Sequence, residues 1–156
     1  MDSEIENDFQ RRPFLMILIG TAIAIGLVGI HAYIIYSLWD VAGWPLTSSK
    51  FQTGILIVGA AVVIGLVIIV LTLFAWRSRQ KSYEDSMKSV RSLGFIIIIL
   101  SLIGVIMAIY YGIVSLGNIT DFPEYAGYFI GRTVCLWAAS GALFLNVVGV
   151  IQVIRD

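Results

Sequence analysis

The sequence predicts an all-α integral membrane protein with four transmembrane helices, arranged as two tandem helical hairpins. The first observation is composition: of 156 residues, 59% are hydrophobic and 13% are charged, and the mean hydropathy is +0.94. Soluble domains are closer to half apolar and a quarter charged, and a core this small cannot bury so much apolar surface. The second observation is four long apolar runs, each at least the roughly 20 residues that cross a bilayer as a helix. The third is an internal repeat with an offset of 78 residues.

The first hairpin is predicted over residues 14–76, with spans at about 14–37 and 53–76. A polar N-terminal tail, residues 1–13, precedes it. Pro13 suits the first turn of a helix, where its missing N–H is not needed. The acidic start lacks the positive charge of a signal peptide, so we expect the first apolar run to remain as a span.

The second hairpin is predicted over residues 92–156, with spans at about 92–116 and 128–153. A basic inner loop, residues 77–91, separates it from the first hairpin. Because the number of spans is even, we expect both chain ends on the same side of the membrane.

The distribution of lysine and arginine predicts which side that is, since short cytoplasmic loops carry an excess of both. The tail, the central loop and the C-terminus carry eight such residues: Arg11, Arg12, Arg77, Arg79, Lys81, Lys88, Arg91 and Arg155. The two opposite corners carry Lys50, and Arg132 if its side chain snorkels outward. We therefore predict that both termini and loop 77–91 are cytoplasmic and that both corners lie outside.

The corner between the first two spans recurs between the last two. Ser37–Pro45 reads SLWDVAGWP and Ser115–Pro123 reads SLGNITDFP, and the register extends to the pair Gly26 and Gly104 without a gap. Two spans per copy give parallel repeats, related by a pseudo-two-fold axis along the membrane normal. The alternative is that any helix leaving a membrane selects Ser, Asn, aromatic residues and Pro at its exit.

Small residues spaced four apart predict where the helices pack, because lipid provides no hydrophobic drive for helix association. Every span has such a face. These residues are Ala22, Gly26, Ala61, Gly65, Gly104, Ala108, Gly112, Ala138 and Ala142. We expect them to hold an intramolecular four-helix bundle; the alternative is that one stripe, such as 104/108/112, docks a partner subunit.

Three polar residues inside the spans are candidate functional groups. His31 is interpreted as a neutral residue that hydrogen-bonds a neighbouring helix, with a cofactor-contacting or proton-linked role as the alternative. Arg132 is interpreted as a residue that snorkels or pairs with a carboxylate at the outer rim, with an anion or substrate contact as the alternative. Asn146 is interpreted as a cross-link between helices.

A polar cluster is predicted at the outer rim. Its members come from both corners and the start of the last span: Asp40, Asn118, Asp121, Glu124 and Arg132. Asn118 also begins a glycosylation sequon, Asn-Ile-Thr, but it lies only two residues past the predicted span, where access for the enzyme is poor.

The sequence contains no catalytic motif, no metal-ligand spacing and no cofactor motif, and its zero net charge predicts no nucleic-acid partner. We therefore expect a non-catalytic membrane subunit that packs into and stabilises a larger membrane complex, for example of the respiratory or oxidase type. Its expected partners are the lipid bilayer and other membrane subunits or itself. One alternative is a small oligomeric transporter or channel, with His31, Arg132 and the corner carboxylates lining its path. A third is an electron-transfer or quinone-reactive protein.

Overall fold

The computed structural model describes the backbone of residues 2–79 and 83–155, and the side chains of residues 11–79 and 87–155. It consists of four long helices and one short 3-10 helix: α1 Asp2–Ala42, α2 Ser49–Arg79, α3 Tyr83–Asp121, η1 Pro123–Tyr125 and α4 Ala126–Arg155. All four long helices are long and apolar enough to span a membrane. The predicted all-α fold with four transmembrane helices is confirmed.

The helices extend beyond the predicted spans at the end that carries the termini. α1 begins at Asp2, so Pro13 lies inside the helix instead of in its first turn. Most of the predicted loop 77–91 is also helical, because α2 continues to Arg79 and α3 starts at Tyr83; Lys81 lies outside the described residues. Hydropathy marks where a helix enters lipid, but Glu, Gln, Lys and Arg are good helix formers and continue it into water.

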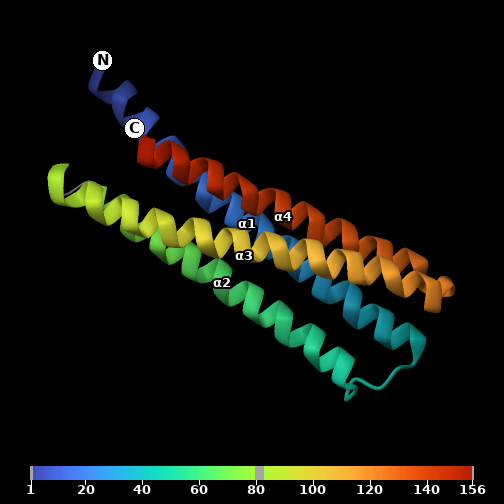
Figure 1. The fold of residues 1–156 in the computed structure, drawn as a ribbon. Coiled ribbons are helices and arrows are strands. Elements are labelled where there is room, and N and C mark those ends of the chain that lie inside the picture. The colour runs from blue at the N-terminus through green and yellow to red at the C-terminus, as the bar shows by residue number, and fades with distance from the viewer. Residues whose placement is uncertain (1, 80–82, 156) are drawn as a thin grey trace.

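The four helices form a bundle with both chain ends at one end and both corners at the other (Figure 1). α4 packs against α1 and α3, and α2 packs against the same two helices. Near the termini, two successive core layers take one residue from each helix: Phe14, Ala75, Val90 and Val153, then Ile17, Ile68, Ile97 and Val150. The third cluster, Ala24, Ala139 and Ala142, comes from α1 and α4 alone.

A buried polar contact fastens α4 to α1. The Asn146 amide nitrogen donates a hydrogen bond to the Thr21 hydroxyl at 2.8 Å, and Asn146 is 0% exposed. Gly20 allows this approach: a Cβ at this position would lie 2.6 Å from the Asn146 amide oxygen and 2.8 Å from the Ala142 carbonyl oxygen. In an apolar medium, close backbone approach and interhelical hydrogen bonds are the main attractions between helices.

Two hydroxyl groups fasten α4 to α3 near the corners. The Ser115 hydroxyl donates to the Phe129 carbonyl at 3.0 Å. The Thr133 hydroxyl lies 3.1 Å from the Gly112 carbonyl across the same interface and 2.9 Å from the Phe129 carbonyl of its own helix, so its one hydrogen is shared between the two. α4 is thus bound to both neighbours by polar contacts as well as by packing.

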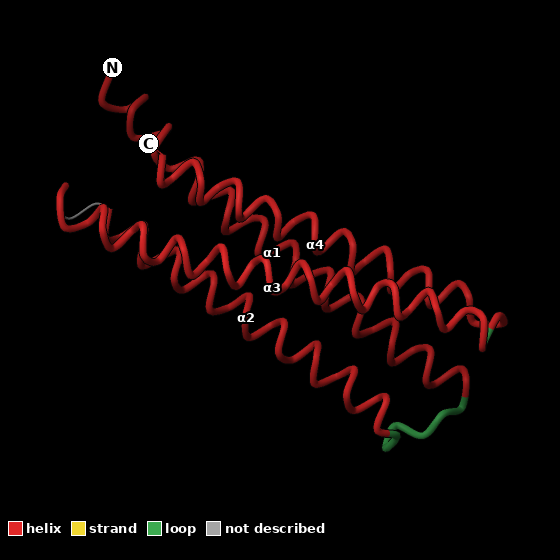
Figure 2. The backbone as a smooth tube through the Cα atoms, in the orientation of Figure 1, coloured by secondary structure: helices red, strands yellow, loops and turns green. Residues whose placement is uncertain are grey.

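α2 is buried only along its second half. Its buried residues, Gly65, Ile68, Thr72 and Ala75, all lie in that half, and the Thr72 hydroxyl donates to the Ile68 carbonyl of its own helix at 2.7 Å. Residues 49–64 include no buried side chain. This half of α2 diverges from the bundle toward the corner, where a longer loop joins it to α1 (Figures 1 and 2).

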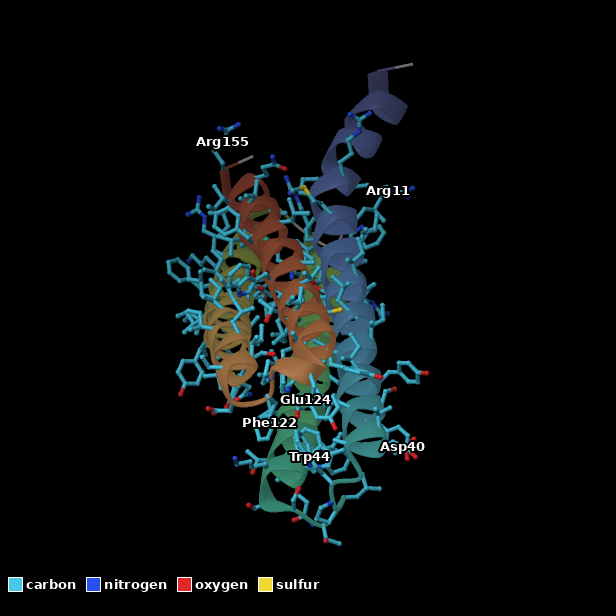
Figure 3. The ribbon with its side chains drawn as sticks, turned by 90° about the vertical axis from the view of Figure 1, so that its right-hand side faces the viewer. Arg11, Asp40, Trp44, Phe122, Glu124 and Arg155 are labelled. Atoms are coloured by element: carbon cyan, nitrogen blue, oxygen red, sulfur yellow. The ribbon has the colours of Figure 1, made fainter. Side chains whose placement is uncertain are left out.

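The two corners contact each other through aromatic side chains. α1 ends with Gly43 in the left-handed region, at φ +64°, and the Trp44 N–H bonds back to the Trp39 carbonyl at 3.0 Å, the pattern of a glycine C-cap. This turn places the Trp44 ring edge-on to Trp39 and to Phe122 of the second corner, both at 5.0 Å between centroids. Figure 3 shows Trp44 and Phe122 at the end of the bundle opposite to Arg11 and Arg155.

Replacing Gly20 with alanine is expected to destabilise the bundle, because the added methyl group meets a backbone carbonyl that cannot rotate away. Forced overpacking of this kind costs about 1–3 kcal/mol. The matched control is Gly29→Ala in the same helix, where a Cβ meets nothing within 4 Å. Thermal unfolding in detergent should show a lower midpoint for Gly20→Ala and an unchanged or slightly higher one for Gly29→Ala. Equal midpoints would contradict the close contact between α1 and α4.

Candidate functional site

A cleft of about 440 Å³ lies where α2 separates from the other three helices, and all four helices line it. Its two ends differ in chemistry. The end near the corners is polar, lined by His31, Trp39, Ser49, Lys50, Thr53, Tyr111, Asn118 and Arg132. The end nearer the middle of the bundle is apolar and includes Ile64, Ile68, Ala139 and Leu143. The volume falls in the range of small-molecule sites, about 300–1,000 Å³.

His31 is buried in the wall that α1 contributes. It is 5% exposed, and its Nδ1 atom has no hydrogen-bond partner among the described residues. It lies eight residues before Trp39, which at 1.5 Å per residue is about 12 Å below the corner. Arg132 of α4 is its immediate neighbour across the cleft. The imidazole therefore lies beside the Arg132 backbone and within reach of its charge, and one ring nitrogen has no partner among the described residues.

Arg132 brings a positive charge to the same depth. Its Nε atom is buried without a partner, and its guanidinium carbon lies 6.0 Å from the Phe129 ring centroid, within range of a cation–π interaction. No carboxylate of the described residues pairs with it. An unpaired arginine inside a membrane helix is unfavourable, and less so where water or an anion reaches it.

The predicted outer-rim cluster is divided by the structure. Asn118 and Arg132 line the cleft, whereas Asp40, Asp121 and Glu124 are exposed. Figure 3 shows Asp40 and Glu124 at the corner end of the bundle. Arg132 therefore does not form the expected pair with a rim carboxylate, because it faces α2 and His31 from inside the bundle while the carboxylates lie on the rim.

The structure places some of the predicted packing residues between helices and others elsewhere. Gly65, Gly104, Ala108, Gly112 and Ala142 lie in contacts between helices.

The other predicted packing residues face elsewhere. Ala22, Gly26 and Ala138 face out of the bundle, and Ala61 lines the cleft. These placements differ from the prediction because a helix that is apolar on all sides gives no indication of which side is buried.

Sequence reasoning missed Gly20 and Gly149, the two glycines at the contact of α1 with α4. The sequence did indicate close packing at both glycines. Gly20 adjoins the polar Thr21, and Gly149 lies three residues after Asn146, on the same helical face. A small residue beside a membrane-embedded polar group indicates a close interhelical contact.

The chemistry available in the cleft is that of a binding site for negative charge. A guanidinium, a lysine ammonium group and an imidazole line it, and no carboxylate is among the lining residues. Nowhere in the described chain do three His, Cys, Asp or Glu residues gather in a group that could hold a metal ion.

The chain matches no protein-family model, no curated protein and no solved structure.

Water is expected to enter the cleft from the corner side, because its polar lining begins there and continues to His31. The test places a cysteine at Ile57, which lines the cleft, or at its neighbour Leu56, which is 73% exposed on the outside of α2. Both variants carry Cys135→Ala, which removes the one native thiol. A membrane-impermeant thiol reagent should modify Ile57→Cys in vesicles and leave Leu56→Cys unmodified. Protection at both positions, or equal modification, would contradict a water-filled cleft.

Proposed function

We propose that the chain is a non-catalytic integral membrane subunit that packs into and stabilises a larger membrane complex. The observation that carries the proposal is an exposed face on α1, which we call the outer stripe: Ala22, Gly26, Gly29, Tyr33 and Tyr36. The spacing of these residues alternates between four and three, as in the contact seam of paired helices. All five are exposed, Tyr33 to 70%.

The outer stripe is unused within the chain. A Cβ on Gly26 or Gly29 would meet nothing within 4 Å. By contrast, the outward face of α3 is bulky, with Phe95, Ile106 and Ile113 all more than half exposed. Lipid tails cover either kind of face, but small residues allow the backbone of another helix to approach closely.

A groove extends the outer stripe toward the termini. It lies between α1 and α4, has a volume of about 320 Å³, and is lined by Leu15, Ile19, Ile23 and Leu145 among others. Leu15 and Ile19 continue the same alternating spacing toward the N-terminus. A transmembrane helix of another subunit, lying along α1, fits both the small stripe and this apolar groove, and we propose it as the occupant.

Two further features belong to this proposal. Trp44 and Phe122 are equivalent positions under the offset of 78 residues, and their contact supports a duplicated hairpin, since a two-fold axis between the corners brings equivalent residues together. The bases that gather at the end with the termini support placing that end in the cytoplasm. Arg11 and Arg155 mark this end in Figure 3.

The cleft favours the second candidate, a small oligomeric transporter. His31 and Arg132 both line it, as a path for an anion would require. The corner carboxylates lie at the rim instead of along the cleft. In this alternative, the outer stripe of α1 would join copies of the same chain.

Replacing Gly26 with leucine is expected to release the chain from its complex, because the larger side chain prevents a partner helix from approaching the outer stripe. The measurement is native mass spectrometry after purification in a mild detergent. We expect the wild-type chain to purify with unrelated membrane subunits in fixed stoichiometry and the Gly26→Leu chain to purify without them.

The matched control is Gly59→Leu on α2, where a Cβ also meets nothing within 4 Å. This variant should remain in the complex, and both variants should unfold at the wild-type temperature when isolated. Purification of the wild type as a homo-oligomer alone would reject the subunit proposal and favour the transporter. Retention of Gly26→Leu in the complex would show that the outer stripe is not the interface.

A further inference from the structure

We propose that the cleft between α2 and the other helices binds a single amphiphile through its anionic head, a carboxylate or a phosphate, and through one apolar chain, either its only chain or one of two. The head would lie against Arg132, and the chain would extend toward the middle of the bundle along α2. This inference does not depend on the proposed subunit function. The cleft and the outer stripe occupy different faces of α1, since His31 and Ile35 line the first whereas Gly29 and Tyr33 belong to the second.

The head position follows from the charges that face the cleft. α4 contributes Arg132, α2 contributes Lys50 at the mouth, and α1 contributes His31; the polar groups of α3 are Tyr111 and Asn118. The lining is thus positive and contains donors but no carboxylate. The Nε of Arg132, which is buried without a hydrogen-bond partner among the described residues, is the group that an anionic head would meet.

The chain position follows from the apolar half of the cleft. Below His31, the lining continues to Thr21 on α1 and to Ile68 on α2, through Ile64, Ala139 and Leu143. Ten residues of helix separate His31 from Thr21, a length of about 15 Å at 1.5 Å per residue. This is a slot for an alkyl chain, and it is closed at its end by the core layer that contains Ile68.

The unpaired charge distinguishes this ligand from a neutral one. A quinone or a neutral lipid would fill the apolar slot but bring no negative charge to the Arg132 guanidinium, whose buried Nε has no hydrogen-bond partner among the described residues. An anionic head supplies that charge and also accepts hydrogen bonds from the planar guanidinium, whose geometry matches carboxylate and phosphate. Two sources have this shared chemistry: a free fatty acid and an anionic phospholipid.

The experiment is titration of the purified full-length chain in maltoside, followed by native mass spectrometry. The probes are oleate, phosphatidylglycerol, phosphatidylcholine and decylubiquinone. We expect one equivalent of oleate or of phosphatidylglycerol to bind: oleate alone identifies a free acid, and phosphatidylglycerol alone identifies a membrane lipid. Binding of neither, or equally tight binding of phosphatidylcholine or decylubiquinone, would overturn the proposal.

Two pairs of variants locate the ligand. Arg132→Gln should weaken binding at least about ten-fold, the effect of losing one hydrogen bond to a charged group, whereas Lys88→Gln, an exposed base of α3 outside the cleft, should not. The Ala61→Phe variant should not bind the ligand, because the added ring fills the slot. The Ala60→Phe variant should bind as the wild type does, because residue 60, the preceding position on α2, is exposed. The second pair keeps the test valid if Arg132→Gln does not fold. Unchanged affinity in Ala61→Phe would overturn the proposal.

Discussion

The contact between Gly20 and Asn146 is the constraint on which the rest of the bundle depends. Lipid is as apolar as the protein interior, so the helices gain nothing by hiding leucine from it. What holds them is close backbone approach and a few hydrogen bonds, and these are concentrated on α4. α4 approaches α1 at Gly20, where Asn146 bonds to Thr21, and it is bound to α3 by the hydroxyls of Ser115 and Thr133.

The cleft is a consequence of this uneven fastening. The first half of α2 has no buried residue, and it contacts α1 only near its start, where Phe51 lies against Trp39 and Gly54 lies close to Ile35. The two hairpins, which share a corner motif in the sequence, therefore differ in packing: α3 and α4 lie tightly together, whereas α1 and α2 separate toward the corner. That separation leaves a cleft that His31 and Arg132 both line. The asymmetry between the hairpins creates the candidate site.

The number and order of the helices were predictable from sequence, because hydropathy and span length depend only on local composition. The contacts Ser115–Phe129 and Thr133–Gly112 were not, because a serine or threonine in a membrane helix bonds as readily to its own carbonyls. Thr72 does so. The role of Arg132 was predictable in part. Its charge inside a span indicated a functional site, but the cleft that it lines results from the divergence of α2, which the sequence does not show. Ala22 and Gly26 indicated close packing, but the structure places both on the outside of the bundle.

The claim that α4 is fastened and the first half of α2 is not can be measured directly with pairs of spin labels. Labels at Ile113 and Ile130 report on the corner half of α3 and α4, and labels at Ile113 and Gln52 report on α3 and α2; all three positions are exposed. Weak local packing predicts larger fluctuations. Double electron–electron resonance should therefore give a narrow distance distribution for the first pair and a broad one for the second, with a narrow control at Phe74 and Phe95 near the termini. Equally narrow distributions for all three pairs would contradict the account.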